Sequence, residues 1–422
     1  MDEVIAADWP NEIELTLDEM AQGGDAVGRW NDRVVFVAGA LPGEHVRVAL
    51  GERQPNYARG RILETLTQAP ERIAPVLADA DHMPWQHIEY SAQLRYKHDI
   101  LTGQLRKLAG LDDALVAATL PVSAPWGYRT TAQLHSDGRQ VGYYAADSHT
   151  LRPIDQDPLL APALNDALAA LQGVLAQETA EPFDVLIRAS ETYGYTLGVL
   201  RGEGDLRFIA ARWRAASPAL AAVQFGSHPQ GVAGNAGLLE TLDDVVFQLR
   251  PLTFFQAHLR AAAALLALVR EGLALTGVER ILDLYCGAGV FALPLARSAA
   301  EVVGIEAATV AVEDGTRSAQ LNGIENVRFV PGTVERALAG IEGPVDAVVL
   351  DPPRRGCHPQ ALAELLRLAP PTVVYVSCHP GTLARDLKIL TDGGYVVERV
   401  TPVDLFPQTP HIESVSVLRH ER

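Results

Sequence analysis

The sequence predicts a three-part protein whose last part is a doubly wound, parallel α/β sheet. From about residue 246 onward, short apolar runs rich in Val and Ile alternate with helical stretches, which is typical of repeated βαβ units. The first 65 residues instead show short alternating stretches between turn signals, which indicate a small, OB-like β-barrel. We therefore expect a barrel over residues 1–68, an α+β domain over 69–245 and the doubly wound domain over 246–422.

Length and composition limit the class of protein. The chain has 422 residues, of which 48% are hydrophobic and 21% are charged, as expected for a soluble protein of two or three domains. Its formal net charge of −17 argues against binding to nucleic acid through a generally basic surface. The acidic start lacks the features of a signal peptide, and no apolar run approaches the length of a membrane span. We expect a cytoplasmic, monomeric protein that does not contact membranes.

Local patterns predict the elements of the first two parts. Alternating apolar residues predict barrel strands at residues 13–17, 33–39, 44–50 and 58–66. In the middle part, helical periodicity predicts helices over 93–111 and 157–177, and a strand pair is expected at 184–190 and 195–202.

The last part has the clearest pattern. Near-continuous apolar runs predict strands that are covered on both faces of the sheet, at residues 279–285, 301–307, 326–330, 346–351 and 372–378. Helical stretches separate or follow them, at residues 290–299, 308–322, 333–340, 358–369 and 381–391.

The first two strand ends of this part indicate a nucleoside-cofactor site. Ligands of open α/β sheets bind beyond the carboxyl ends of the strands, where Gly287 and Gly289 allow a tight turn. The next strand ends at Glu306, whose carboxylate can accept hydrogen bonds from ribose hydroxyls. The third glycine of the dinucleotide fingerprint is missing, because Phe291 and Ala292 follow. S-adenosylmethionine, which has no phosphate, therefore fits better than NAD.

The fourth strand end, Asp351-Pro-Pro-Arg354, limits the kind of methyl transfer that the protein can catalyse. Methyltransferases that act on exocyclic amines usually carry an aromatic residue where Arg354 stands, so this residue disfavours amine methylation.

The fifth strand end supplies a candidate nucleophile. Only three cysteines are present, Cys286, Cys357 and Cys378, which excludes a disulfide framework and a metal site of four thiolates. Cys378 leaves its strand at the carboxyl edge and precedes a helix, whose N-terminus favours a thiolate. We expect Cys286 to serve packing and Cys357 to lie on a surface loop without a role.

A candidate base lies on the final strand. Glu413 alternates with Val415 and Val417, which places it on the face expected to be buried. A cysteine, a carboxylate and a methyl donor together suit methylation at carbon 5 of uracil. A thiolate that adds to carbon 6 makes carbon 5 nucleophilic, and a base then removes the carbon 5 proton.

Several blocks resemble the RNA 5-methyluridine methyltransferase family. They are FFQ (254–256), LDLYCGAGVF (282–291), LDPPRRG (350–356), VSCHPGTLARDL (376–387) and FPQTPHIESV (406–415), and WQHIEYSAQLRYKHDIL (85–101) also matches. The N-terminal stretch resembles the TRAM domain, an OB-like barrel. The resemblance implies a Rossmann-like methyltransferase domain, with Cys378 as nucleophile and Glu413 as general base. It further implies S-adenosylmethionine contacts from Gln256, Tyr285, Glu306 and Asp351, and a uridine flipped out of single-stranded or looped RNA.

The chain departs from the family at several positions. Many members carry a four-iron, four-sulfur cluster on cysteines of the central domain, and the aligned residues here are Val76, His82, Trp85 and Asp157. None of these replaces a thiolate, so we expect no iron–sulfur cluster and no metal. His379 and His258 stand where the family usually has Asn, and Val290 stands where it has a small or polar residue.

We expect the protein to make 5-methyluridine in RNA, and TRAM-bearing members favour 23S ribosomal RNA as the target. Transfer RNA is the alternative. Methylation of cytosine is disfavoured, because those enzymes carry a second cysteine after the fourth-strand prolines, where Arg354 stands. A non-catalytic RNA-binding protein with the same fold is disfavoured by the presence of both Cys378 and Glu413.

Overall fold

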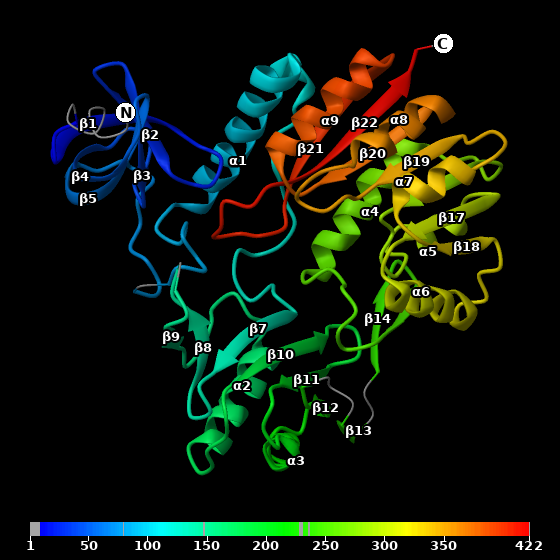
Figure 1. The fold of residues 1–422 in the computed structure, drawn as a ribbon, viewed down its shortest axis with the longest axis horizontal. Helices are drawn as coiled ribbons and strands as arrows, with labels where there is room; N and C mark the ends of the chain where they lie inside the picture. Colours follow the sequence, from blue (N-terminus) through cyan, green and yellow to red (C-terminus); the bar gives the residue numbers. More distant parts are fainter. Residues whose placement is uncertain (1–8, 79, 147, 228–230, 235–236, 422) are drawn as a thin grey trace.

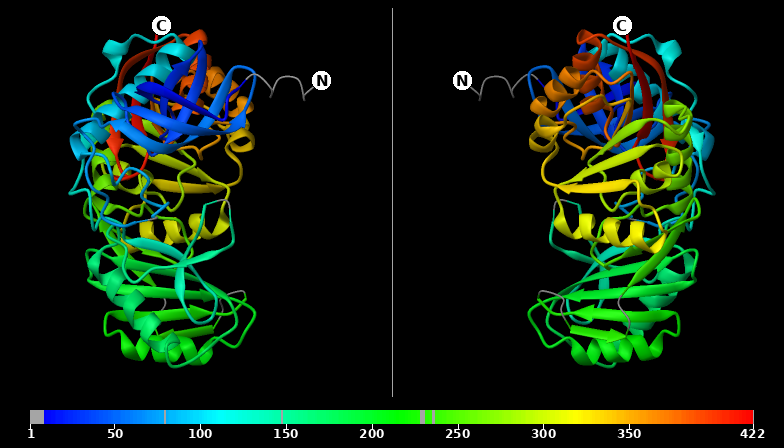
Figure 2. Two further views of the ribbon diagram at one scale, coloured as in Figure 1. Left: turned by 90° about the vertical axis from the view of Figure 1, so that its left-hand side faces the viewer. Right: turned by 90° about the vertical axis from the view of Figure 1, so that its right-hand side faces the viewer.

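The computed structural model describes residues 9–78, 80–146, 148–227, 231–234 and 237–421. A closed barrel and an eight-stranded sheet lie side by side, and a seven-stranded sheet lies below them in Figure 1. The two side views in Figure 2 show the seven-stranded sheet and its helices below the rest of the molecule. Among the described residues, no helix combines the length and the apolar character that a membrane crossing requires.

The N-terminal barrel confirms the four predicted strands and adds a fifth. Its strands close in the order β1-β2-β3-β5-β4. The strand that the pattern did not predict, β2, is short, and it contains Gly28 opposite Leu17. A side chain at Gly28 would collide with the Thr16 carbonyl oxygen of β1, so the close approach of the two strands requires glycine. The strands are β1 (Glu12–Met20), β2 (Ala26–Trp30), β3 (Arg33–Ala38), β4 (His45–Arg53) and β5 (Tyr57–Thr67).

The central sheet has the order β13-β12-β11-β10-β7-β8-β9, and the predicted strand pair forms its antiparallel centre, β10 and β11. Two helices pack on it, α2 (Pro162–Leu175), where a helix was predicted, and α3 (Arg207–Ala216). The strands are β7 (Thr131–Ser136), β8 (Val141–Tyr144), β9 (Leu151–Pro153), β10 (Phe183–Ser190), β11 (Tyr195–Arg201), β12 (Leu220–Phe225) and β13 (Gly231–Gly234).

The large sheet confirms the doubly wound fold, with the order β18-β17-β16-β19-β20-β22-β21-β6. Its strands are β16 (Arg280–Leu284), β17 (Glu301–Glu306), β18 (Val327–Pro331), β19 (Ala347–Leu350), β20 (Thr372–Ser377), β21 (Tyr395–Asp404), β22 (Glu413–His420) and the short β6 (Leu120–Pro121). The helices are α4 (Leu259–Leu273), α5 (Ala292–Ala296), α6 (Thr309–Leu321), α7 (Val334–Ala337), α8 (Pro359–Leu368) and α9 (Pro380–Asp392). Strands β18 to β20 are parallel, whereas β22 runs antiparallel to both of its neighbours.

A stretch expected in the central domain lies elsewhere. Helix α1 (Tyr90–Gln104) packs against α9 and contacts the barrel, and its residues share one hydrophobic core with both. Strand β6 adds to the edge of the large sheet through β21. At the expected junction near residue 245, β14 (Leu238–Leu242) pairs with β15 (Val245–Leu249). The domain boundaries given above stay predictions.

A buried ion pair holds α1 against the large sheet. Lys97 Nζ of α1 donates to Asp404 Oδ1 at 2.6 Å, and both side chains are 0% exposed. Lys97 also donates to the Phe406 carbonyl at 2.9 Å, and the Tyr90 hydroxyl donates to Asp404 Oδ2 at 2.8 Å. Because each charge has several hydrogen-bond partners, the pair is compatible with complete burial.

Replacing Lys97 with Met should destabilise the protein, because Asp404 would remain buried without its cation. We expect the free energy of unfolding to fall by about 3–5 kcal/mol, measured by urea denaturation. The control is Lys388→Met, which removes an exposed pair with Asp392 and should change stability by about 0.5 kcal/mol or less. Equal losses in the two variants would contradict this role for the buried pair.

Candidate active site

The candidate residues meet at one edge of the large sheet. Neighbouring parallel strands end there, so Tyr285 follows β16, Asp351 follows β19 and Cys378 follows β20, while Glu306 ends β17. Strand β22 runs in the opposite direction and therefore begins at this edge, with Glu413 as its first residue. The topology thus collects five of the six predicted residues along four neighbouring strand ends and one strand start.

The strand register brings Cys378 and Glu413 together. Ser377 pairs with Ser414 across β20 and β22, so the next positions toward the edge are Cys378 and Glu413. On its other side, Glu413 pairs with Val403 of β21. The Glu413 side chain is buried, and Cys378 is half-buried.

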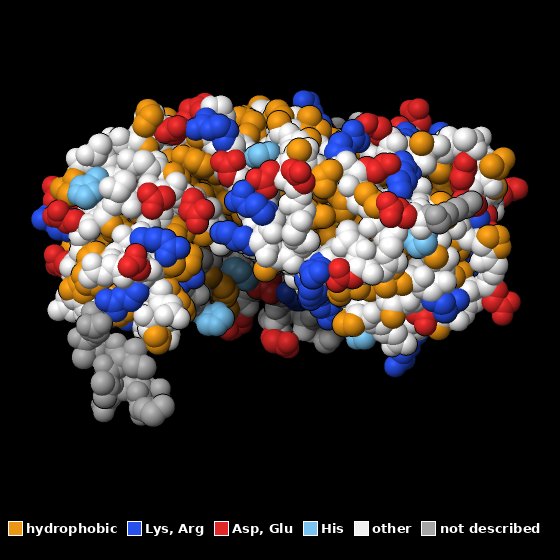
Figure 3. Space-filling model, turned by 90° about the horizontal axis from the view of Figure 1, so that it is seen from above, with side chains coloured by type: hydrophobic (Ala, Val, Ile, Leu, Met, Phe, Trp, Pro, Cys, Tyr) orange, Lys and Arg blue, Asp and Glu red, His pale blue; other side chains and the backbone are white. Residues whose placement is uncertain are grey.

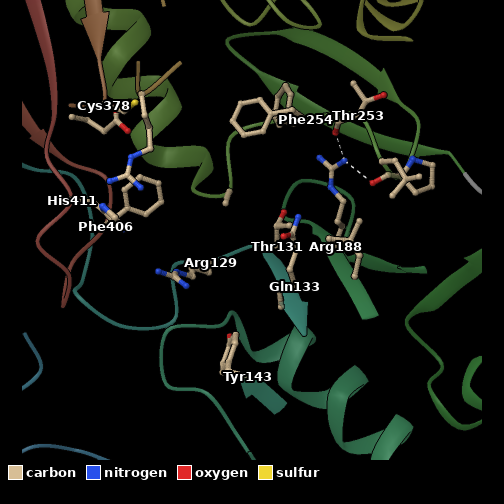
Figure 4. A pocket seen from close by; sticks show the side chains of 18 residues that line it. Arg129, Thr131, Gln133, Tyr143, Arg188, Thr253, Phe254, Cys378, Phe406 and His411 are labelled. Carbon is tan, nitrogen blue, oxygen red and sulfur yellow. Dashed lines mark hydrogen bonds between the residues drawn. The ribbon is translucent and has the colours of Figure 1, made fainter. Parts of the chain in front are cut away.

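Both residues line a cavity of about 680 Å³ between the large sheet and the central sheet. Figure 4 shows Cys378, Phe406 and His411 on one side of it, and Thr131, Gln133 and Arg188 on the other. The cavity therefore combines the proposed reacting groups with walls from two sheets. Its lining includes Arg129, Thr131, Gln133, Tyr143, Arg188, Phe254, Arg354, Cys378, Phe406, His411 and Glu413.

Burial and neighbouring carboxylates raise the pKa values of the two candidate catalytic groups. Burial raises the pKa of Glu413 to about 8 and Asp351 adds to the rise, whereas Lys97 and Arg354 oppose it. Burial also raises the pKa of Asp351 to about 7. A carboxyl group with a pKa near 8 is well matched to proton transfer at neutral pH.

The thiol of Cys378 differs from the expectation. Its position before α9 predicts a thiolate, but burial, Glu413 and Asp351 raise its pKa to about 11. Arg354 lowers this pKa without cancelling the other effects. Desolvation and two nearby carboxylates therefore outweigh the helix N-terminus, and the thiol is protonated at neutral pH in the free protein.

Arginine side chains shape the cavity walls. Arg188 is 4% exposed, and its Nη1 donates to the carbonyls of Pro251 at 3.1 Å and Thr253 at 2.6 Å. These bonds hold the loop that carries Phe254, which is 73% exposed and lines the cavity. At the opposite wall, desolvation, Arg354, Lys97 and Arg129 lower the pKa of His411 to about 4, so its ring is neutral at physiological pH.

The predicted cofactor residues lie beside this cavity and do not line it. Glu306 accepts hydrogen bonds from the Gly287 amide at 3.1 Å and the Ala308 amide at 2.7 Å, which ties the glycine turn to the end of β17. Tyr285 opens that turn with a left-handed φ of 64°. Gln256 is half-buried in the loop between the lining residues Phe255 and Ala257.

The other two cysteines are buried. Cys286 is 5% exposed within the glycine turn, in agreement with a packing role. The expectation of a surface loop for Cys357 was wrong: it is 3% exposed, and its Sγ donates to the Tyr375 hydroxyl at 3.6 Å. The sequence around Cys357 does not predict burial, because the residues that cover it come from a distant element. Asp386 of α9 accepts a hydrogen bond from the Cys357 amide.

The positions aligned with cluster cysteines hold other contacts. His82 Nε2 lies 3.3 Å from Asp157 Oδ2, and the Tyr143 hydroxyl donates to the same oxygen at 2.7 Å. Trp85 is buried, and Val76 is 55% exposed. Within the described ranges, no group of three His, Cys, Asp or Glu side chains is placed to hold a metal ion. The absence of an iron–sulfur cluster stays a prediction.

Sequence reasoning alone did not single out Lys97, Arg129, Arg188 and His411. Only Lys97 could have been noticed from the sequence, because it is a lysine in a helix whose buried face includes apolar residues. The arginines lie in different elements, and only the fold brings them to one cavity.

Comparison with known proteins identifies the family. Residues 244–421 match the family described as tRNA (Uracil-5-)-methyltransferase, and residues 11–63 match the TRAM domain. An uncharacterized RNA methyltransferase of Thermosynechococcus vestitus is 36% identical over 96% of this chain and 97% of its own length. The chain belongs to the RNA uracil-5-methyltransferase family. A relative from Halalkalibacterium halodurans, also named an uncharacterized RNA methyltransferase, is 32% identical over 96% of both chains.

A solved structure supports the fold of this methyltransferase. The tRNA (uracil-54, C5)-methyltransferase of Pyrococcus abyssi, in complex with S-adenosyl-L-homocysteine, superposes with a TM-score of 0.77 and 22% identity. The match covers 96% of this chain and 100% of the other. The likeness confirms the arrangement of barrel, central sheet and doubly wound sheet.

Replacing Glu413 with Gln should make the stability of the methyltransferase less dependent on pH. In the folded state Glu413 keeps its proton up to about pH 8, whereas the ordinary pKa of a glutamate is 4.5. A raised carboxyl pKa contributes stability below pH 4.5 that is lost as the pH rises through 8. The wild type should therefore lose roughly 2–4 kcal/mol over this range that Glu413→Gln does not lose.

The measurement is urea denaturation at about pH 5 and about pH 9. The control is Glu398→Gln, which changes an exposed glutamate of β21 and should keep the wild-type pH dependence. Identical pH dependence in the wild type and Glu413→Gln would contradict the raised pKa.

Proposed function

We propose that this methyltransferase makes 5-methyluridine in RNA through a covalent bond between Cys378 and carbon 6 of the uracil ring. The observation that carries the proposal is the meeting of a thiol and a buried carboxyl group in one cavity at the sheet edge. The two groups come from different strands, and the antiparallel β22 is what brings them together.

Each residue has a defined task in the proposed reaction. The Cys378 thiol gives its proton to solvent water, its sulfur attacks carbon 6, and the electron pair moves toward carbon 5, which becomes nucleophilic. After carbon 5 has gained the methyl group, Glu413 in its ionised form takes the carbon 5 proton. The carbon 5–carbon 6 double bond then re-forms, and the Cys378 sulfur leaves with its electron pair. Arg354 favours the thiolate, because it lowers the pKa of Cys378.

The residues beside the cavity fit S-adenosylmethionine, which supplies the methyl group when it is bound. Asp283 is wholly buried, and its Oδ1 has no hydrogen-bond partner among the described residues, so one polar atom is left to pair with a ligand. A side chain at Gly287 would meet open space, which leaves room at the turn. Glu306 retains acceptor capacity, because each oxygen receives one backbone amide. We propose Gln256, Tyr285, Glu306 and Asp351 as contacts, with Asp283 added.

The RNA would be held locally at the cavity. Acidic and basic side chains are interspersed on the face in Figure 3, in agreement with the net charge of −17. Phe254 and Tyr143 offer rings for base stacking, and Arg129 offers a cation in the same cavity.

We propose ribosomal RNA as the substrate, on the resemblance to TRAM-bearing members. Transfer RNA is the alternative, because the similar Pyrococcus abyssi enzyme acts on tRNA.

Two variants should separate the two catalytic tasks. Cys378→Ala should lower the transfer of labelled methyl groups to RNA by about 1,000-fold or more, because no bond to carbon 6 forms. Glu413→Gln should accumulate a covalent protein–RNA complex, seen as a slow band on a denaturing gel. Methylation by Cys378→Ala at the wild-type rate would contradict the proposed mechanism. Absence of the slow band in Glu413→Gln would contradict the role of Glu413 as the base.

Mapping of 5-methyluridine in total RNA should identify the substrate. A deletion strain should lack the modification at a position of 23S ribosomal RNA, and the wild-type gene should restore it whereas Cys378→Ala should not. Loss from tRNA would select the alternative target. An unchanged set of 5-methyluridines in both RNAs would contradict uridine methylation.

A further inference from the structure

The loop between β1 and β2 of the barrel reaches the loop that carries Cys378. The side-chain amide of Gln22 lies 2.7 Å from Nε2 of His379, a residue 357 positions away. The same barrel loop packs closely, because a Cβ on Gly24 would lie 2.8 Å from Pro410. Trp85 Nε1 also donates to the Gly24 carbonyl at 3.2 Å. In Figure 1 this loop lies next to the segment that leads into β22.

His379 connects this contact to helix α9. It is the N-cap residue, and its Nδ1 accepts a hydrogen bond from the Thr382 amide at 3.2 Å. A nitrogen that accepts carries no proton, so the ring proton lies on Nε2, which faces Gln22. Burial and Arg354 lower the pKa of His379, which keeps the ring in this neutral form. The Gln22 atom that faces this nitrogen is its amide nitrogen, and a half-turn of the carboxamide brings the amide oxygen to the same place, where it accepts from Nε2.

His379 directly follows Cys378, so the cap also fixes the thiol. The Ser377 hydroxyl accepts from the His379 amide at 3.2 Å, which joins the end of β20 to the start of α9. The first turn of a helix favours a nearby anion only over a short distance. The placement of Cys378 against that turn therefore depends on the placement of His379.

We propose that Gln22 is a positioning residue of the catalytic loop: through its hydrogen bond to His379, the barrel holds Cys378 in its reactive position. The barrel then contributes to the chemical step, in addition to any contact that it makes with RNA. The part of the proposal that concerns methyl transfer rests on the function proposed above. The part that concerns the thiol does not.

A double-mutant cycle in the full-length protein tests the link. Gln22→Ala removes the amide and keeps the helix cap. His379→Asn also keeps a cap, because Asn is a good N-cap residue, but its shorter side chain does not reach Gln22. The control is Gln54→Ala, which changes an exposed glutamine of the same barrel. The readout is the rate of Cys378 alkylation by iodoacetamide, followed by mass spectrometry, with the buried Cys286 and Cys357 as slow internal references.

Loss of one hydrogen bond should slow alkylation of Cys378 about five-fold in Gln22→Ala, in His379→Asn and in the double variant alike. Gln54→Ala should match the wild type. The equal effect of single and double variants is the signature of one shared bond. Additive effects, or a rate in Gln22→Ala that is unchanged or higher, would overturn the proposal.

Methyl transfer gives a second readout. Gln22→Ala should lower kcat about five-fold and leave the KM for RNA unchanged, because the bond acts on the thiol and not on RNA binding. A raised KM with an unchanged kcat would overturn the positioning role and assign Gln22 to RNA binding. If the wild type methylates no uridine, the proposed function fails, and the alkylation cycle still decides whether the barrel positions Cys378.

Discussion

The antiparallel pairing of β22 between β20 and β21 is the constraint on which the site depends. In a purely parallel sheet, only residues after strands reach the ligand edge, whereas a reversed strand also places its first residue there. Glu413 arrives at the edge in this way, one position beyond the Ser377–Ser414 pair and next to Cys378. A slip of one residue would turn the side chains of β22 to opposite faces, so the proposed reacting geometry depends on this register.

Several buried acidic side chains lie at this edge of the large sheet, and their burial lowers the stability of the folded protein. Burial raises the pKa of Glu413 and Asp351, and burial with Asp351 nearby raises that of Asp283 well above its ordinary value. Groups with such shifts destabilise the folded state as they ionise, and they are common at functional sites. Lys97 limits this cost at Glu413. Its ion pair with Asp404 also holds α1, so one side chain serves both packing and the electrostatics of the site.

The parts of the fold that local patterns control were predictable, and those set by distant pairing were not. The five parallel strands follow from apolar runs, and their ends differ from the prediction by at most one residue. Strand β2 contains a glycine that interrupts its alternation of apolar and polar residues, and β6 has only two residues. Neither strand therefore shows the two-residue periodicity that predicts a strand. The sequence led to Cys378 through its strand end, and to Glu413 through its alternation with Val415 and Val417. The links from Lys97 to Asp404 and from Gln22 to His379 join residues about 300 or more apart, which no local pattern encodes.

The three parts of the chain converge on one short stretch of backbone around Cys378. The large sheet supplies the thiol and the carboxyl group, the central sheet supplies the opposite wall of the cavity, and the barrel contacts the residue that follows the thiol. In the proposed reaction the target base therefore passes between two sheets, where Arg129 and Phe254 lie. This arrangement explains how an acidic protein can act on RNA. In the proposed reaction the attraction needs to operate only at the cavity, where Arg354 lines the wall and lowers the pKa of Cys378, so one cation can aid binding and chemistry together.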